Sequence, residues 1–496
     1  MSSSESTASQ LPLFHVVGFS GHRQLGDPAA VARAMTETLE GLRREADSEW
    51  VALSSVAMGA DQLFVNQARR LGLSWHAILP LPRAEFSRDF TEAEWGTVEA
   101  TLAGAENIRV ITENGSRDDA YLDCGMETVN GCDVLLAVWD GDPARGKGGT
   151  ADVVEYARSL KKPIVIIDAN TQVARRENFA LFHRKDSSLA YLNGLPAARM
   201  GWGENPFKAP DHIFAFQQKA DYAASHGAPQ FRRLIISTVM LHLMATIIAA
   251  AGVSFDMHFA ALPWVKLLCL SGALVVALVL RHHHEHHNWV RCRLAAEFCR
   301  SALATWGLPR AAPLFQDLDL PGVTGLTRAL HILHSRSASA QPVPMTDFKA
   351  IYLAKRIDDQ LSYYQRQENT ALPQHSRLKI GFWVATILAL VCTAVYALCY
   401  TIDAEVPHWF ESIVFYFLPI ALPFVAATFI SFISINDLQR RVARYREMRA
   451  MLEESRQQVA FCQTWNSLER IVLKTERALL QEVLEWHSIT SFAESH

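Results

Sequence analysis

The sequence predicts two parts of different fold class: an α/β part with a doubly wound parallel sheet, then an all-α membrane domain with four transmembrane helices. Two observations predict this division. Up to residue 205, short apolar runs alternate with helical patterns, which is typical of parallel strands joined by helices. After residue 230, four apolar blocks of about 22 residues follow, and about 20 apolar residues suffice to cross a bilayer.

The composition limits the classes of function open to the chain. With 496 residues, it is long enough for two or three domains. The formal net charge of −4 gives no sign of nucleic-acid binding, so we expect no nucleic-acid partner. The eight cysteines include no Cys-x-x-Cys pair, which indicates a reducing interior without a disulfide framework. The polar residues 1–11 are predicted to form a disordered tail.

The first domain, residues 12–205, contains six predicted strands. Each strand is a short apolar run, and the runs are residues 13–18, 51–56, 75–80, 107–112, 134–139 and 163–168. Helical patterns lie between them at residues 28–46, 61–72, 86–104, 119–131 and 149–161. In such sheets, ligands bind beyond the carboxyl ends of the strands, near the switch in strand order.

Three of the predicted strand ends continue into glycine-rich polar loops. Glycines allow positive φ angles and a close approach of the backbone to a ligand. The predicted helix start at Thr150 offers free N–H groups to a phosphate, while Arg23 and Lys147 add positive charge. We therefore predict a ligand site without catalytic or metal-binding residues. Its residues are Gly18, Ser20, Gly21, His22, Arg23, Gly59, Ala60, Asp61, Gln62, Trp139, Asp140, Lys147, Gly148, Gly149 and Thr150.

Four segments of this domain resemble one known superfamily. The loops "SGHR" (20–23), "AMGADQL" (57–63) and "WDGDPARGKGGTADVVEYA" (139–157) together resemble the SLOG superfamily, a Rossmann-like group related to the DNA-processing protein DprA and the LOG hydrolases. "LPLPRAEFSRDF" (79–90) resembles the segment after the third strand in SLOG domains of bacterial conflict systems. The resemblance implies a nucleotide-derived ligand, such as a cyclic oligonucleotide or an ADP-ribose derivative, and no further cofactor.

The sequence departs from the catalytic pattern of the LOG hydrolases. Their signature PGGxGTxxE supplies a glutamate for N-glycosidic cleavage, whereas residues 147–152 read KGGTAD and the first glutamate is Glu155. A carboxylate such as Asp152 near a helix N-terminus often only complements the helix dipole. We therefore expect binding rather than catalysis. A membrane-tethered nucleotide hydrolase is the alternative. Trp139 can stack on a base or pack under its own loop.

The predicted spans divide the second half of the chain into two modules. The spans are residues 234–255, 259–280, 380–402 and 412–435. The first module covers residues 212–304, and the second covers residues 346–496, including cytoplasmic helices at its end. Residues 305–345, rich in Pro, Gly, Ser and Ala, are predicted to be a cytoplasmic linker with a short helix.

The distribution of basic residues predicts how the spans are oriented. Arginines and lysines lie just before the first span and just after the second span of each hairpin, whereas the loops within the hairpins, at 254–262 and 403–411, contain neither. Cytoplasmic loops carry an excess of these residues. We therefore expect a multi-pass protein of the inner membrane with both termini in the cytoplasm.

The two modules repeat one pattern. "PQFRRL" (229–234) precedes the first hairpin and "PQHSRL" (373–378) precedes the second. An aromatic-x3-Arg-x3-Glu-x2-Arg pattern follows each hairpin, at 289–300 and at 445–456, and its members share one helix face. Two spans followed by such a helix resemble the SLATT effector domains, which occur beside SLOG domains. The resemblance implies a membrane effector.

Together, these features predict an effector that senses a nucleotide-derived second messenger. We expect it to respond by oligomerising and permeabilising the inner membrane, in antiphage defence. Its expected partners are the signal molecule, membrane lipid and further copies of the chain. A nucleotide-regulated channel or transporter is a further alternative, although transporters usually carry ionisable residues within their spans, where this chain has very few.

Overall fold

The chain divides into two compact units, which we call the sheet unit and the helical unit. The sheet unit comprises Met1–Ala197, Lys208–Phe216 and Thr305–Val343, and the helical unit comprises Ala198–Phe207, Gln217–Ala304 and Pro344–His496. The computed structural model describes residues 9–111, 116–144, 146–182, 187–196, 204–257, 259, 261–282, 285–310, 312–315, 322–338 and 343–492. Most of the predicted N-terminal tail lies outside these residues.

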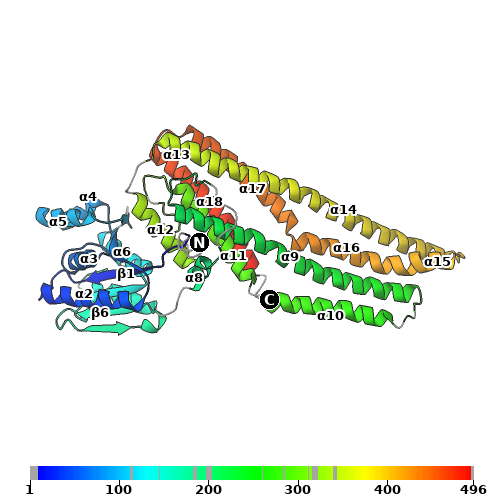
Figure 1. Cartoon of the computed structure of the whole chain (residues 1–496), viewed down its shortest axis with the longest axis horizontal. Coiled ribbons are helices and arrows are strands. Elements are labelled where there is room, and N and C mark those ends of the chain that lie inside the picture. The colour runs from blue at the N-terminus through cyan, green and yellow to red at the C-terminus, as the bar shows by residue number, and fades with distance from the viewer. Residues whose placement is uncertain are drawn as a thin grey trace, which may run out of the picture. The chain divides into compact units, whose positions relative to one another are not determined.

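The described residues of the sheet unit form a seven-stranded sheet in the order β4-β3-β2-β1-β5-β6-β7 (Figure 1). The strands are β1 (Phe14–Gly21), β2 (Glu49–Ser54), β3 (Ser74–Leu79), β4 (Asn107–Val110), β5 (Val134–Trp139), β6 (Ile164–Asp168) and β7 (Ala174–Glu177). The first six are parallel, which confirms the predicted fold class. The antiparallel strand β7 was not predicted, because its sequence ARRE is mostly exposed and has no apolar run.

The first strand is longer than predicted, and its extension defines the switch in strand order. β1 continues beyond Gly18 because it pairs with β5 as far as Gly21, opposite Val138. On its other side β1 pairs with β2. The strand order therefore reverses between β1 and β5, where doubly wound sheets bind their ligands.

Helices cover the sheet between the strands. They are α2 (Pro28–Glu45), α3 (Ala60–Arg70), α4 (Arg83–Phe86), α5 (Glu92–Leu102), α6 (Arg117–Gly131), α7 (Thr150–Ser159) and α8 (Ser187–Asn193). The predicted helix 86–104 is divided in two. Thr91 and Glu94 form a capping box, with the Thr91 backbone N–H donating to Glu94 Oε2 at 2.8 Å, and this starts α5 as a new helix.

The region predicted as a linker contributes a helix to the sheet unit. This helix is α12 (Thr324–Ala338). Arg328 Nη1 lies 2.7 Å from both carboxylate oxygens of Asp133, next to the start of β5. Arg336 donates to Glu49 Oε2 at 2.7 Å, at the start of β2, and to Ser74 Oγ at 3.0 Å, at the start of β3. α12 therefore lies along the amino edge of the sheet, opposite the edge where the strands end.

The helical unit contains the four predicted spans. Its elements are α9 (Asp211–Ser254), α10 (Ala261–His282), α11 (Glu285–Thr305), α13 (Met345–Tyr352), the π-helix η3 (Leu353–Asp358), α14 (Asp359–Thr401), α15 (His408–Phe410), the π-helix η4 (Glu411–Phe417), α16 (Leu418–Ile435), α17 (Leu438–Phe461) and α18 (Trp465–Phe492). Among the described residues, four helices are long and apolar enough to cross a membrane, as predicted.

Each hairpin packs through small residues, which lets its two helices approach closely. In the first hairpin, a Cβ added to Gly252 of α9 would lie 2.6 Å from Leu262 of α10. In the second, a Cβ on Gly381 of α14 would lie 2.9 Å from the Phe429 ring of α16. α14 and α16 run side by side in Figure 1. Large apolar side chains such as Leu268 and Leu390 stay exposed and are available to lipid or to another copy.

Candidate functional site

The loops after β1 and β5 are joined across the switch in strand order. The backbone N–H of His22 donates to Val138 O at 3.3 Å, and Asp140 N lies 3.2 Å from His22 Nε2. The Asp140 carboxylate lies 3.0 Å from the same ring nitrogen and accepts from the Asp142 N–H. Burial opposes ionisation of Asp140, but these hydrogen bonds lower its pKa. The centre of the predicted site therefore holds an ionised carboxylate.

The start of α3 closes against the same loop. Gly59 has a φ of +88°, and an added Cβ would lie 2.2 Å from the carbonyl oxygen of Arg23. The N–H of Ala60 donates to His22 O at 3.1 Å. A Cβ on Gly21 would lie 2.6 Å from the Cβ of Ala60. Both glycines are therefore required for packing of the chain on itself, with or without a ligand.

Two polar residues of α3 lie beneath this loop. Asp61 Oδ1 accepts from the hydroxyls of Ser54 at 3.1 Å and Ser55 at 2.8 Å. Burial raises the pKa of Asp61 to about 7, although the two serines and Arg23 oppose this rise. Gln62 is buried and donates to Val56 O at 2.9 Å. Gln62 therefore supports the turn, while Asp61 can gain or lose a proton near neutral pH.

Arg23 meets residues that the sequence did not single out. Its guanidinium lies 5.8 Å from the ring centroid of Tyr121 on α6. The Tyr121 hydroxyl donates to the Asp89 carboxylate at 2.5 Å, and Arg117 Nε donates to the same carboxylate at 2.9 Å. Asp89 lies in the segment 79–90. The loop 20–23 and this segment, which carry the SLOG resemblance, therefore converge on Tyr121.

The glycine-rich loop after β5 is fixed to the first turn of α6. Lys147 forms an ion pair with Asp119, and this contact raises the pKa of Lys147. Gly148 has a φ of +79°, and an added Cβ would lie 2.5 Å from the backbone N of Leu122. Gly149 caps α7 and Thr150 is its buried first residue. The charge of Lys147 is thus already matched by a carboxylate.

Two other predicted site residues lie in packed surroundings. Trp139 Nε1 donates to Asp142 O at 2.8 Å, and the Arg158 guanidinium lies 5.5 Å from its ring. This geometry favours packing of Trp139 under its own loop. Gly18 lies within β1, where an added Cβ would be 2.9 Å from Cys132 Cβ. Ser20, half-buried in β1 opposite Ala137, is nearer the strand end.

The carboxylates nearest to the LOG signature position have other contacts. Asp152 Oδ2 accepts from the Gly148 N–H at 2.9 Å, so it stabilises the loop. The Glu155 side chain is 77% exposed and lies 3.7 Å from Arg158. Among the described residues, no group of three or more His, Cys, Asp and Glu is placed to hold a metal ion.

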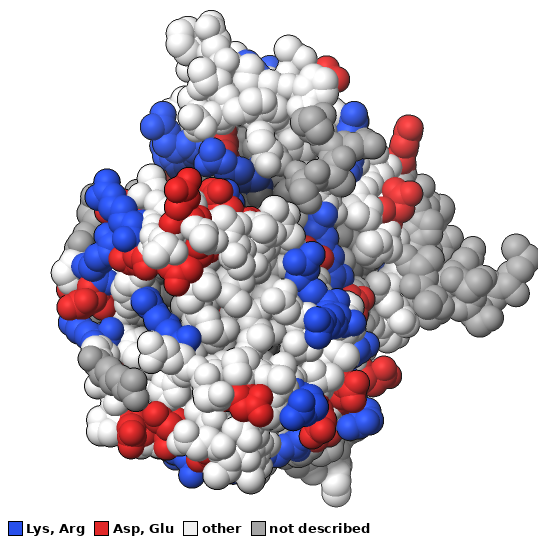
Figure 2. Space-filling view, turned by 90° about the vertical axis from the view of Figure 1, so that its left-hand side faces the viewer, with Lys and Arg blue, Asp and Glu red and all other residues white. Residues whose placement is uncertain are grey.

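One face of the molecule carries charges of both signs. Figure 2 shows lysine and arginine side chains interspersed with aspartate and glutamate around a wide uncharged area. Nucleic-acid-binding surfaces typically gather basic residues on one face instead. The expectation that the chain has no nucleic-acid partner stays a prediction.

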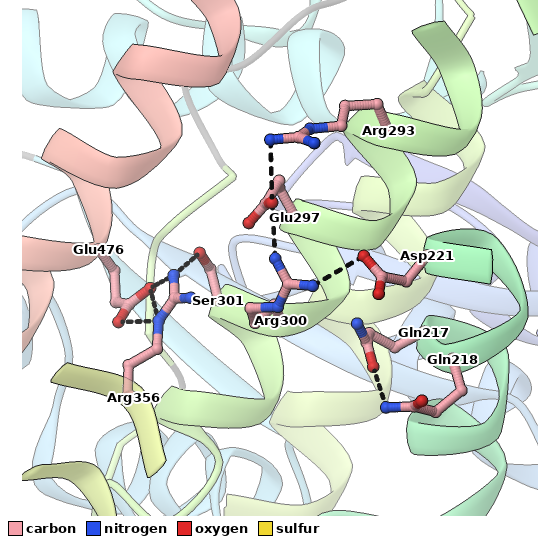
Figure 3. A network of polar contacts seen from close by, with 9 residues as sticks. All are labelled: Gln217, Gln218, Asp221, Arg293, Glu297, Arg300, Ser301, Arg356 and Glu476. Atoms are coloured by element: carbon pink, nitrogen blue, oxygen red, sulfur yellow. Dashed lines mark hydrogen bonds and ion pairs between the residues drawn. The ribbon is translucent and has the colours of Figure 1, made fainter. Parts of the chain in front are cut away.

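A charge network in the helical unit connects elements of both predicted modules (Figure 3). On α11, Arg300 donates to Glu297 at 2.6 Å and to Asp221 of α9 at 2.9 Å. Burial opposes ionisation of Glu297, but neighbouring arginines lower its pKa to about 2. Next to it, Arg356 of η3 donates to Glu476 of α18 at 2.6 Å.

Arg356 completes this network between the modules. Its guanidinium also donates to Ser301 Oγ of α11 at 3.2 Å, and the Tyr352 hydroxyl donates to Glu476 at 2.9 Å. Arg356 and Glu476 are 2% and 0% exposed. A buried pair of this kind depends on both partners, because either charge alone would be uncompensated. The first module is thus joined to the start and the end of the second.

The repeated aromatic-Arg-Glu-Arg pattern makes similar contacts in both modules. In the first, Arg300 pairs with Asp221 on the helix that leads into the hairpin. In the second, Arg449 pairs with Glu368 on α14 at 2.9 Å, and Arg456 pairs with Asp358 of η3 at 2.8 Å. The pattern therefore fixes the helix after each hairpin to the chain before it.

Comparison with known proteins finds a two-span effector domain over each hairpin, and the first match continues through the predicted linker into α12. Residues 215–333 match the family described as SMODS and SLOG-associating 2TM effector domain 3, and residues 352–486 match SMODS and SLOG-associating 2TM effector domain 1. No curated protein matches the chain. The SLOG resemblance of residues 12–205 stays a prediction. The chain therefore contains two SLATT domains, each a two-span membrane effector module, together with an N-terminal α/β domain.

Proposed function

We propose that a nucleotide-derived ligand binds at the carboxyl edge of the sheet and makes the membrane spans self-associate and permeabilise the inner membrane. The observation that carries this proposal is the presence of two SLATT effector domains that follow a doubly wound sheet along the chain. The polar loops at the switch between β1 and β5 supply the ligand site. Antiphage defence is the proposed setting.

The chemistry of the site favours a ligand that carries both phosphate and sugar. Arg23 is exposed and offers a guanidinium, which binds phosphate in a bidentate manner. The ionised Asp140 repels phosphate but accepts hydrogen bonds from ribose hydroxyls. We place the phosphate near Arg23 and a ribose near Asp140. A cyclic oligonucleotide and an ADP-ribose derivative both contain these groups.

The proposed response requires a large shift in population. Converting a mostly closed assembly into a mostly open one needs about 5.5 kcal/mol of differential binding energy. Self-association lets several bound ligands share this demand. The proposed orientation, with both termini in the cytoplasm, places the sheet where a cytoplasmic nucleotide can reach it.

A ligand screen on the full chain in lipid nanodiscs tests the proposal. The panel contains cyclic di- and trinucleotides, ADP-ribose and its cyclic isomers, NAD and AMP. A ligand at about 100 times its Kd adds about 2.7 kcal/mol to the stability of the state that binds it. We expect one class to raise the melting temperature of the wild type and of Arg70→Ala, an exposed control at the far end of α3, but not of Arg23→Ala.

The same samples distinguish binding from catalysis. Chromatography of the nucleotide after incubation is expected to recover it intact. Turnover would support the hydrolase alternative instead. If no nucleotide shifts the melting temperature, or if Arg23→Ala binds as well as Arg70→Ala, the proposed site is wrong. A bound ligand that releases no dye from loaded liposomes would contradict the permeabilising response.

A further inference from the structure

α12 occupies a particular place in the chain. It belongs to the sheet unit, whereas α11 before it and α13 after it belong almost entirely to the helical unit. Only residues 339–344 separate α12 from α13, and six residues span at most about 20 Å. The connection therefore keeps the start of α13 within about 20 Å of the end of α12.

Ion pairs hold α12 on the amino edge of the sheet. Arg328 binds both oxygens of Asp133, which also accepts the Val16 N–H at 2.8 Å. Arg336 pairs with Glu106 at 3.2 Å in addition to Glu49, and its guanidinium lies 4.9 Å from the Phe14 ring. These two arginines thus contact residues at the starts of five strands.

The inner face of α12 mixes apolar and unsatisfied polar groups. Leu326 and Leu330 are fully buried. His334 is buried against the Trp306 ring, with the ring centroids 4.8 Å apart. Among the described residues, nothing hydrogen-bonds to Nε2 of His334 or to Nδ1 of His331. An unsatisfied buried polar group is unfavourable, and it regains water when the helix leaves. Such an interface is suited to release.

We propose that α12 is a releasable strap that, while docked on the amino edge of the sheet, restrains the two SLATT hairpins that it connects. The restraint rests on the proposed function, because the motion that it limits is the one that permeabilises the membrane. While α12 is docked, the hairpins can adopt fewer positions, because the chain connects them to it. When α12 is released, the hairpins can adopt more positions, so the docked state is the restrained one.

Two measurements on the full chain in phosphatidylethanolamine–phosphatidylglycerol liposomes test the strap. Hydrogen exchange reports the protection of the α12 amides, and release of trapped carboxyfluorescein reports permeability, both without added nucleotide. In Arg328→Ala/Arg336→Ala we expect amide protection to fall about ten-fold or more, as for the loss of charge-assisted hydrogen bonds. We expect dye release to rise several-fold. Arg310→Ala, an exposed arginine in the same region, is the control.

Each outcome decides the proposal. Lost protection with unchanged dye release would show that α12 does not restrain the hairpins. Unchanged protection would show that the ion pairs do not hold the helix. Arg328→Lys/Arg336→Lys, which keeps both positive charges, is expected to keep both readouts closer to wild type than the double alanine variant.

A tightened variant covers the case in which the double variant fails to fold. His334→Phe keeps the ring stacked on Trp306 and removes the unsatisfied nitrogen. We expect higher α12 protection and slower dye release, and faster release would overturn the strap. If a nucleotide makes the wild type release dye but the Arg328→Ala/Arg336→Ala variant leaks no more than the wild type without nucleotide, the strap is refuted and the proposed sensing is not. If the double variant leaks but the chain binds no nucleotide, the proposed sensing is refuted and the strap is not.

Discussion

Breaking the buried pair between Arg356 and Glu476 tests whether the charge network holds the two SLATT modules together. Arg356→Met leaves the Glu476 carboxylate fully buried, with a hydrogen bond from the Tyr352 hydroxyl of α13. Removing one partner of a buried pair destabilises by about 3–5 kcal/mol. At about 2–4 °C per kcal/mol for a unit of this size, the expected loss in melting temperature is roughly 6–20 °C.

The double variant separates the charge from the packing. Arg356→Met/Glu476→Leu removes both charges and fills similar space, and such replacements are often close to neutral. The hydroxyls of Tyr352 and Ser301 then lose one partner each, so we expect a loss smaller than that of Arg356→Met alone.

A pair whose arginine is exposed supplies the control for this cycle. Arg446 lies 2.6 Å from Glu368, the same distance as the buried pair, and its side chain is 57% exposed, whereas that of Glu368 is 12% exposed. Glu368 keeps its ion pair with Arg449 when Arg446 is replaced, so Arg446→Met is expected to cost about 0–1 kcal/mol. The assay is the temperature at which half of the detergent-solubilised full chain leaves its monodisperse chromatographic peak. An Arg356→Met variant as stable as Arg446→Met would refute the reasoning, as would a double variant less stable than Arg356→Met.

Three further predictions concern the sheet unit. Burial lowers the pKa of His334 from 6.5 to about 4 and that of His331 from 6.5 to about 3. Docking of α12 is therefore fully stable above pH 6.5 and weakens as the pH falls, and at pH 5.5 we expect each histidine to contribute a loss of about 1.4 kcal/mol. The loss is measured as faster amide exchange and is expected to be about half as large in His334→Phe. A fragment of residues 1–216 lacks α12, so adding a peptide of residues 322–338 is expected to raise its melting temperature, whereas a peptide with Arg328→Glu/Arg336→Glu is not. Gly148 has a φ of +79°, and a Cβ added there would lie 2.5 Å from a backbone atom, so Gly148→Ala is expected to destabilise the loop by about 2 kcal/mol or more. The melting temperature and the ligand affinity measure this loss. Gly141 also has a positive φ but faces open space, so Gly141→Ala is the control and is expected to cost only the backbone strain of about 1 kcal/mol.

The parallel strands and the spans could be predicted because each is a continuous apolar run whose length fits its environment. β7 could not, because Ala174–Glu177 is a polar edge strand held by pairing with β6. The end of β1 also depended on a distant partner, since pairing with β5 extends it to Gly21. Local patterns therefore located the elements, and long-range pairing decided their limits.

In the candidate site, too, the local sequence predicted some features and only the fold revealed others. The glycine-rich loops were visible in the sequence, but the packing of Gly59 on Arg23 and of Gly148 on α6 requires the fold. Tyr121 and Asp89 have no local signature, because their contact joins residues 32 positions apart. The helical pattern of α12 was readable, whereas its attachment to the sheet depends on acids scattered at the starts of separate strands.

The duplication of the SLATT module within one chain has a consequence for any assembly. Each added chain brings one hairpin of each kind, so the total number of hairpins is always even and the two kinds occur in equal number. The copies are also free to diverge, because a substitution in one is not repeated in the other. The residues at the contact between the two modules, such as Arg356 and Ser301, can be kept while other faces of either module change to suit a neighbouring chain. In an assembly of chains with a single module every hairpin is identical, so no hairpin can acquire a contact that the others lack.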